Sequence, residues 1–506
     1  MSSPRHGPAS SRIVGTTGAS VASGHAHRPV PRPHVPAGTT PPVTSATTLP
    51  VTSRRRRSAL IVLCFVQFML VLDDTVVSIA LPSIRSDLGF TTAGLAWVVN
   101  AYFLAFGGLL VLFGRAADRW GRRRIFLAGV ALFGAASLLC GLAQEPWQLV
   151  VGRFVQGAGA AMASPAALAL ITLLFSGTAE RARALSVWGG IAGLGGTMGL
   201  VISGVLTDLS SWRWIFLINL PVAALALALS PRLVAESRAT SRVRLDVAGA
   251  VLGTGAVLAL VYGLLQAGES ASGDAPVVGS LLLAAVLGGS FLAVESRTAQ
   301  PLVPLTFLAF RPRAVANLAF LLFSATFYAM AFLLMIQLQT VVGYSPFQAG
   351  VAYLPYGGGI LAGMWLSARL LIRFGMRRLL VGSFLVSAVG LFLLAGVAAS
   401  DNYATGVLPG MLVTSLGCGL TLPALTGAAL TGTTQDDAGL GSAMVTSVQQ
   451  VGGAVGLAAL VTLATGYSDA TKGFSYALTI GAALLLIGAA VIATLLPSSR
   501  PRPGRA

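Results

Sequence analysis

The chain has 506 residues, of which 55% are hydrophobic and 10% are charged, and its mean hydropathy is +0.81. Soluble domains carry about 25% charged residues, so this composition excludes a water-soluble enzyme. The formal charge of +17 raises the question of nucleic acid, but the cations gather between apolar segments. We therefore interpret the charge as a signal of membrane topology and expect no nucleic-acid partner.

The first 53 residues are rich in Pro, Ser, Thr, Gly and Ala, and we predict a disordered N-terminal tail over 1–53. Apolar segments long enough to cross a bilayer then recur to the end of the chain. We predict an all-α integral membrane protein with fourteen transmembrane helices, near residues 58–82, 95–113, 125–144, 147–175, 184–207, 214–230, 247–266, 277–294, 314–339, 348–368, 379–398, 404–431, 440–465 and 476–496.

The loops between these spans differ in charge from one side to the other. Only Arg85, Arg213 and Lys472 fall on one side, and most other cations fall on the opposite side. The positive-inside rule makes the richer side cytoplasmic. An even number of spans then places both termini in the cytoplasm, and we expect the chain in the cell membrane.

Two adjacent acids, Asp73 and Asp74, lie well inside the first predicted span. Ionisable groups at this depth cost roughly 2.5–3.5 kcal/mol on insertion scales, so they normally face a cavity or a partner. Neighbours on a helix point about 100° apart, so the two carboxylates cannot both face one cavity squarely. Reversible protonation of such a carboxylate is the basic requirement for proton coupling. A structural, hydrogen-bonded acid is the alternative.

A charge-dense segment, GRAADRWGRRR, occupies Gly114 to Arg124 between the second and third spans. A shift of 254 positions pairs four of its arginines and one glycine with the later segment RLLIRFGMRR, residues 369–378: Arg115 with Arg369, Arg119 with Arg373, Gly121 with Gly375, and Arg123 and Arg124 with Arg377 and Arg378. A basic hinge used twice indicates a duplicated membrane protein, a common plan among secondary transporters. We predict an arrangement of six, two and six spans: a six-helix bundle over 54–230, a basic loop with two extra helices over 231–310, a second bundle over 311–496, and a cytoplasmic tail over 497–506.

The fourth span contains Arg153, the only cation within any predicted span, with Gln156 on the same helix face. Arginine does not deprotonate in practice, so it needs a counter-charge, and Asp73 or Asp74 is the candidate. Protonation of that acid would weaken the pair and bias two global states. A purely structural role for Arg153 is the alternative.

Two further stripes in the second half predict a surface that accepts apolar ligands. Gln449 and Gln450 belong to a polar stripe in the thirteenth span, and Phe327 and Tyr328 to an aromatic and methionine-rich part of the ninth. We take these four residues and Gln156 as candidate substrate-binding residues. Aromatic residues that face lipid or simply pack are the alternative.

Other chemistries lack the residues they need. All four histidines lie in the N-terminal tail, the three cysteines lie within spans, and Lys472 is the only lysine. We therefore expect no metal site, no cofactor, no catalytic triad and no phosphate-binding loop of the Walker type. Any uphill work must draw on an ion gradient or on a separate ATPase subunit.

Four segments together resemble the fourteen-span drug:proton antiporters of the major facilitator superfamily, over residues 58 to 496. LDDTVVSIALP, from Leu72 to Pro82, is similar to the first-span motif, with Ser78 in place of the usual Asn. The gating motif between the second and third spans resembles GRAADRWGRRR. The fourth-span motif resembles GRFVQGAGAA, which begins at Gly152. A further hallmark of the family is similar to WRWIFLINLP, which begins at Trp212.

The resemblance implies the major facilitator fold, in which two six-helix bundles rock around a midplane cavity. It implies a proton-binding role for Asp73 and a coupling role for Arg153, with Asp74 at a variable position of the motif. It also implies a charge latch that involves Asp118 and the hinge arginines. The gating motif covers Gly114, Asp118, Arg119, Gly121, Arg122 and Arg123.

The fifth span departs from the family pattern. The antiporter motif carries Gly-Pro followed by Gly-Gly, whereas this chain has Gly199-Leu200 and Ser203-Gly204. This departure bears on the direction of transport rather than on the fold.

The sequence therefore predicts a proton-coupled exporter of small amphipathic compounds, not an enzyme. We expect the substrate, protons and the lipid bilayer as its partners, and a monomer. Two alternatives remain: a proton-coupled symporter that takes up a metabolite, and a membrane sensor that transports nothing.

Overall fold

The computed structural model describes residues 53–175, 177–238, 245–268, 274–298, 301–303, 307, 309–397, 402–433 and 438–497. The predicted tails fall almost wholly outside the described residues. Within them every regular element is a helix: α1 Ser53–Leu88, α2 Thr92–Trp120, α3 Arg122–Gly141, α4 Pro146–Leu174, α5 Thr178–Leu209, α6 Trp214–Leu217, α7 Asn219–Leu233, α8 Val247–Gln266, α9 Ala275–Arg297, α11 Arg311–Thr340, α12 Pro346–Ala352, α13 Leu354–Phe374, α14 Met376–Ala395, the π-helix η1 Tyr403–Val407, α15 Leu408–Ala429, α16 Ala438–Thr465 and α17 Ala470–Leu495.

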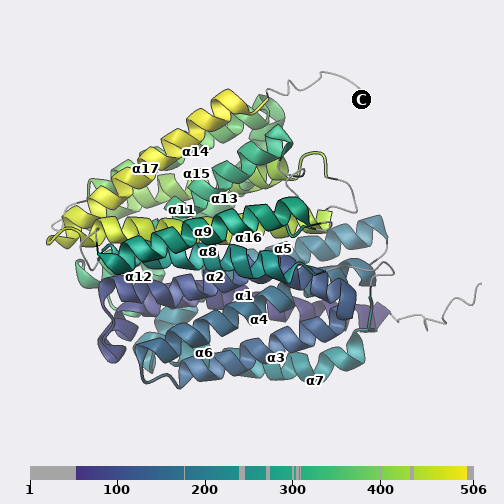
Figure 1. The fold of residues 1–506 in the computed structure, drawn as a ribbon. Coiled ribbons are helices and arrows are strands. Elements are labelled where there is room, and N and C mark those ends of the chain that lie inside the picture. Colours follow the sequence, from purple (N-terminus) through teal and green to yellow (C-terminus); the bar gives the residue numbers. More distant parts are fainter. Residues whose placement is uncertain are drawn as a thin grey trace, which may run out of the picture. The chain divides into compact units, whose positions relative to one another are not determined.

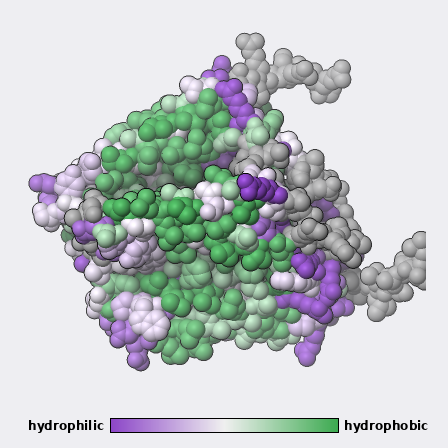
Figure 2. All heavy atoms as spheres, viewed as in Figure 1, coloured by the Kyte–Doolittle hydropathy of each residue, from purple (hydrophilic) through white to green (hydrophobic). Residues whose placement is uncertain are grey.

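Thirteen helices in the described part of the chain are long and apolar enough to cross a membrane. They run alongside one another in Figure 1, and Figure 2 shows apolar atoms over their middle and hydrophilic atoms towards their ends. The remaining predicted span, 348–368, falls on α12 and α13, which are separated at Tyr353. The all-helical, multi-span architecture is confirmed, and the count of fourteen stays a prediction.

The duplication seen in the sequence extends to the helix boundaries. A shift of 254 positions turns the bounds of α3 into those of α14, and the bounds of α2 into the start of α12 and the end of α13. The packing repeats as well: α1 contacts α5 as α11 contacts α16, and α3 contacts α4 as α14 contacts α15. We call α1–α7 the first repeat and α11–α17 the second repeat.

Each repeat has a glycine where its basic hinge joins two helices. Gly121 has a φ of 117° and Gly375 a φ of 77°. Because side chains rarely tolerate these angles, glycine lets one helix end and the next begin without a longer loop. We call this side of the bundle the hinge end.

The two repeats meet closely at the end away from the hinges. The side-chain amide of Gln339 donates to the carbonyl of Ile79 at 2.9 Å, and the hydroxyl of Ser345 donates to the Asp208 carboxylate at 3.0 Å. A Cβ on Gly204 of α5 would stand 2.8 Å from the carbonyl of Pro346. Towards the hinge end of the same helix, Gly189 is exposed and has open space where a Cβ would stand.

The helices α8 and α9 pack against each other, and α8 also contacts both repeats. The hydroxyl of Thr462 on α16 donates to the carbonyl of Leu264 at 2.7 Å. Near the hinge end, Arg115 on α2 donates to the carbonyl of Pro301, just beyond α9, at 2.5 Å. The extra pair therefore lies against α2 and α16, where one repeat adjoins the other.

Candidate functional site

A fully buried ion pair lies inside the first repeat. The guanidinium Nη1 of Arg153 on α4 is 2.5 Å from Oδ2 of Asp73 on α1, and both side chains are 0% exposed. The counter-charge expected for Arg153 is therefore Asp73. Removing two charges from water is costly, so such a pair persists only where further hydrogen bonds satisfy its atoms.

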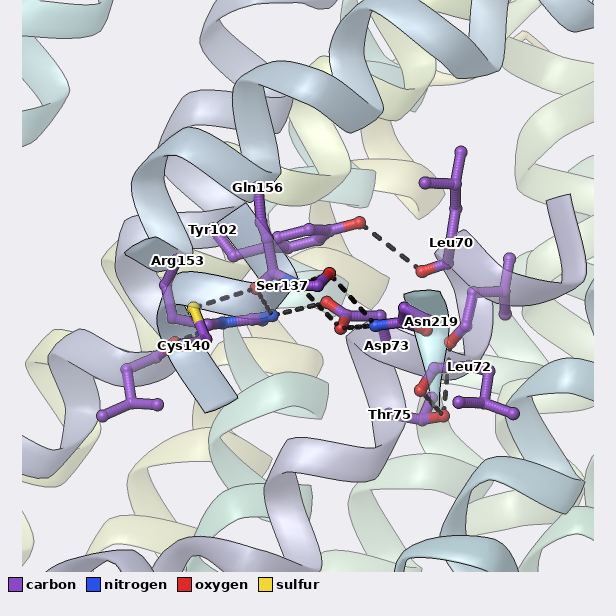
Figure 3. A network of polar contacts seen from close by, with 12 residues as sticks. Leu70, Leu72, Asp73, Thr75, Tyr102, Ser137, Cys140, Arg153, Gln156 and Asn219 are labelled. Carbon is purple, nitrogen blue, oxygen red and sulfur yellow. Dashed lines mark hydrogen bonds and ion pairs between the residues drawn. The ribbon is translucent and has the colours of Figure 1, made fainter. Parts of the chain in front are cut away.

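Polar groups from two other helices complete this arrangement (Figure 3). Oδ1 of Asp73 accepts hydrogen bonds from the amides of Gln156, at 3.0 Å, and Asn219, at 2.8 Å. The Gln156 amide also donates to the hydroxyl of Ser137 on α3 at 2.8 Å. We call Asp73, Arg153, Gln156, Asn219 and Ser137 the Asp73 network.

The guanidinium of Arg153 is held on its other sides by backbone and rings. Its Nε donates to the carbonyl of Val98 on α2 at 2.9 Å, and its Cζ lies 4.4 Å from the centre of the Tyr102 ring. Its Nη2 is buried and has no hydrogen-bond partner in the part of the chain that the structure describes. Arg153 therefore has one donor group in reserve when its partner changes charge.

Asp74 has a different environment from its neighbour. Its Oδ1 is buried without a hydrogen-bond partner among the described residues, and the residue keeps a partly exposed surface. The two acids thus differ: Asp73 accepts three hydrogen bonds within the first repeat, whereas Oδ1 of Asp74 has no partner among the described residues.

The predicted substrate-binding residues do not all lie together. Gln156 is fully buried in the Asp73 network. Phe327 and Tyr328 are partly exposed on α11, where the Tyr328 ring lies 4.6 Å from that of Phe103 on α2. A Cβ on Gly453 would stand 2.5 Å from the same tyrosine ring.

The two glutamines on α16 also differ in their exposure. Gln449 is partly exposed, and Gln450 is buried where α16 packs against Gly107 on α2. Within the described ranges, Oε1 of Gln450 has no hydrogen-bond partner.

The first hinge is ordered by two acids. Asp118 forms an ion pair with Arg122 at 2.7 Å, one turn away. Glu236, in the segment after α7, accepts hydrogen bonds from the backbone N–H groups of Arg123 at 3.1 Å and Arg124 at 3.2 Å. A carboxylate at the start of α3 satisfies its free N–H groups and opposes the helix dipole.

The other predicted hinge residues have different surroundings. The guanidinium of Arg123 donates to the carbonyls of Pro231 and Val234, and Arg119 is exposed. Gly114 is partly exposed and faces Pro165, at a Cβ distance of 3.9 Å. Arg123 thereby fastens the hinge to the last turn of α7 and to its C-cap residue.

Four polar residues of the structure were not predicted from the sequence: Ser137, Asn219, Glu236 and Asp87. Asn219 is part of the WRWIFLINLP segment, and a buried amide within an apolar span was the available signal. The start of that segment is held by an acid. The carboxylate of Asp87 accepts a hydrogen bond from the indole N–H of Trp212 at 3.0 Å and forms an ion pair with the guanidinium of Arg213 at 2.5 Å. Glu236 gave no signal, because it is a loop acid far along the chain from α3.

Long apolar helices in two repeats, with an ion pair buried between α1 and α4, define a multi-pass membrane protein of the transporter class. Residues 63–457 match the family model of the Major Facilitator Superfamily, and the chain belongs to this superfamily. The resemblance inferred from the four motifs is confirmed.

Two curated relatives illustrate the similarity. The chain is 41% identical over 466 residues to "Puromycin resistance protein pur8" of Streptomyces alboniger, covering 88% of this chain and 92% of that one. It is 41% identical over 450 residues to "Lincomycin resistance protein" of Streptomyces lincolnensis, with the same coverage. Among solved structures, an inward-facing bacterial homologue of the human lysosomal transporter Spinster superposes with a TM-score of 0.64 at 16% identity, covering 87% of this chain and 97% of that one.

Proposed function

We propose that the protein is a proton-driven exporter of small amphipathic compounds, of the kind that confers antibiotic resistance. The observation that carries this proposal is the fully buried ion pair between Asp73 and Arg153. The names of the relatives, which include puromycin and lincomycin resistance proteins, support a drug-like cargo. The protein works as a monomer with fourteen spans arranged as six, two and six.

Proton exchange at Asp73 would change the contacts of α1. The ionised carboxylate accepts from Arg153, Gln156 and Asn219 at once. A neutral carboxyl group becomes a donor at one oxygen, so it cannot keep all three donors in place. Protonation at Oδ2 therefore displaces Arg153 of α4, which must find another acceptor, while Oδ1 can still accept from Gln156 and Asn219. This local change biases two arrangements of the helices.

The packing of the two repeats supports alternating access. The repeats are fastened to each other at the end away from the hinges through Gln339 and Ser345. The hinge-end part of α5 has open space beside Gly189 and Gly190. With the basic hinges in the cytoplasm, this form faces inwards. In the outward-facing form the hinge ends close, and the hinge contacts of Asp118 and Arg122 contribute to that closure.

The altered motif on α5 keeps a tight seal in this form. Gly199 lies against Thr75 of α1, with 2.2 Å between a built Cβ and the threonine hydroxyl, and Gly204 lies against the backbone of Pro346. Close approach of small residues stabilises helix contacts in membranes. The seal therefore does not need the missing proline, which supports export.

The test uses everted membrane vesicles with an imposed pH gradient that is acidic inside. Export predicts that puromycin dissipates the gradient and accumulates inside the vesicles. Asp73→Asn is expected to abolish both signals while the protein remains in the membrane. Gradient-driven depletion of a metabolite from the vesicles would favour the symporter alternative. A protein that moves no compound of a broad panel in liposomes would favour the sensor.

A further inference from the structure

Two buried acids lie together at the hinge end of the extra helix pair, outside the Asp73 network. Asp246 immediately precedes α8 and is 7% exposed, and Glu295 in the last turn of α9 is 2% exposed. A Cβ on Gly249 would stand 2.7 Å from Oδ2 of Asp246 and 2.9 Å from Oε1 of Glu295. The two carboxyl groups therefore border the same small space.

The oxygens of these two acids are not equally satisfied. Oε1 of Glu295 accepts hydrogen bonds from the backbone N–H groups of Leu302 at 3.1 Å and Val303 at 3.3 Å. Oδ1 of Asp246 accepts from the backbone N–H of Gly249 at 2.8 Å and so caps α8. Oδ2 of Asp246 is buried and has no hydrogen-bond partner among the described residues. Such an oxygen is costly as part of a carboxylate, whereas a proton would make it a donor to a neighbouring acceptor.

Apolar side chains pack around this corner of the bundle. A small buried cluster joins α2, α8 and the segment 301–303, and it consists of Val111, Leu112, Ala250 and Leu302. Side chains from the start of α16 pack against the cluster. Buried charges in such a place persist only where they are balanced.

The charged groups near the corner come from three elements. Arg115 on α2 donates to the carbonyl of Pro301 at 2.5 Å, so α2 and Glu295 hold the same segment, residues 301–303. Arg297 in the last turn of α9 is exposed, and the sequence of α16 contains no charged residue. One guanidinium cannot balance two ionised carboxylates, and two carboxylates that share a site favour the binding of a proton.

We propose that Asp246 and Glu295 bind one proton between them and form a second proton site, separate from Asp73. The proton lies on Oδ2 of Asp246 and is directed at Oε1 of Glu295. The corner then holds one carboxylate, one carboxylic acid and the Arg115 guanidinium.

Loss of this proton leaves two ionised carboxylates beside each other, and they repel. The end of α9 and residues 301–303 then separate from α2, next to the first hinge. A rise in pH at the hinge end therefore frees the extra pair from the helix that leads into the hinge. This proposal goes beyond the proposed function, and its test needs no transport.

The test follows amide hydrogen exchange of Leu302 and Val303 in the purified full chain, from mildly acidic to mildly alkaline buffer. Rates are corrected for the intrinsic effect of pH, and a peptide from the start of α14 is the internal reference. Asp246→Asn and Glu295→Gln remove one charge and keep a hydrogen-bonding amide, whereas Glu295→Ala removes the acceptor. Asp274→Asn is the matched control, because Asp274 precedes α9 at the other end of the pair and is exposed. Elution as a single peak in size exclusion is the folding control.

We expect wild-type exchange at these two amides to rise by about tenfold as the proton is lost, a change of about 1.4 kcal/mol. The protection is present at low pH and disappears as the pH rises, because the bound proton provides it. Asp246→Asn and Glu295→Gln should stay protected across the range, since neither can hold two negative charges. Glu295→Ala should exchange fast at every pH, and Asp274→Asn should follow wild type.

A wild type without this transition would overturn the proposal. The proposal would also fall if either amide variant kept the transition, or if both loosened the segment at every pH, because both carboxylates would then be ionised in the folded protein. If the transition is present but puromycin dissipates no gradient in the vesicles, the proposed function fails and the proton site stands. If puromycin is transported and the transition is missing, the proton site fails and the proposed function stands.

Discussion

The two repeats have the same backbone plan and different chemistry. Positions equivalent to Asp73, Arg153 and Gln156 in the second repeat are Phe327, Val407 and Gly410. The first repeat therefore carries the buried ion pair, and the second carries rings and small residues. In the proposed function, the first repeat exchanges the proton and the second forms a surface for cargo.

The two hinges differ in the same way. The position equivalent to Asp118 is Ile372, and that equivalent to Glu236 is Ala490. In the second hinge Arg369 lies over the ring of Trp365 at 3.6 Å, and Arg377 donates to the carbonyl of Ala493 near the end of α17. The first hinge is balanced by carboxylates, and the arginines of the second contact rings and a helix terminus.

The largest effect on stability should come from splitting the buried pair. Arg153→Ala leaves Asp73 buried without its counter-charge, which costs about 3–5 kcal/mol. The equivalent change in the second repeat, Val407→Ala, removes only buried methyl groups, at about 2 kcal/mol. Thermal unfolding in detergent, followed by tryptophan fluorescence, compares the two.

The double variant Asp73→Asn/Arg153→Ala sharpens this comparison, because it removes both charges. It should be more stable than Arg153→Ala alone, since the two sites are coupled. Equal or additive losses in the double variant would mean that the pair contributes no coupling energy.

A side chain at the hinge glycines gives the next largest effect. Gly121→Ala places a Cβ 2.6 Å from a carboxylate oxygen of Glu236 at a φ of 117°. Backbone strain of this kind costs about 1–3 kcal/mol, and the collision adds to it. Gly375→Ala has backbone strain too, at a φ of 77°. The position equivalent to Glu236 in the second repeat is Ala490, so Gly375→Ala meets no carboxylate there. Melting temperatures should therefore fall further for Gly121→Ala, and a reversed order would contradict the role of Glu236.

The sequence predicted the membrane class, the span positions and the duplication well, because apolar length, glycine and arginine are local signals. It did not predict the division at Tyr353, where α12 ends and α13 begins. It also left open which acid pairs with Arg153, since adjacent residues share a span but not a direction. Gln156 was predicted at the cargo surface, and the structure places it beside Asp73. A role of Gln156 in substrate binding stays a prediction. Its position could not be derived from the sequence, because packing between helices far apart in the chain decides which side chains meet.

The smallest effect concerns the cap on α3. Glu236→Ala removes the acceptor for the backbone N–H groups of Arg123 and Arg124, at a cost of about 1 kcal/mol. Glu236→Gln keeps an acceptor and loses only the charge, about 0.3–1 kcal/mol. Amide hydrogen exchange of a peptide from the start of α3 should be faster in both variants, more so with alanine. The peptide from the start of α14, where no glutamate is present at the equivalent position, should be unchanged. Salt should weaken the difference between glutamine and wild type, because it screens exposed charges. Equal exchange of the α3 peptide in all three proteins would leave Asp118 as the only acid that orders the first hinge.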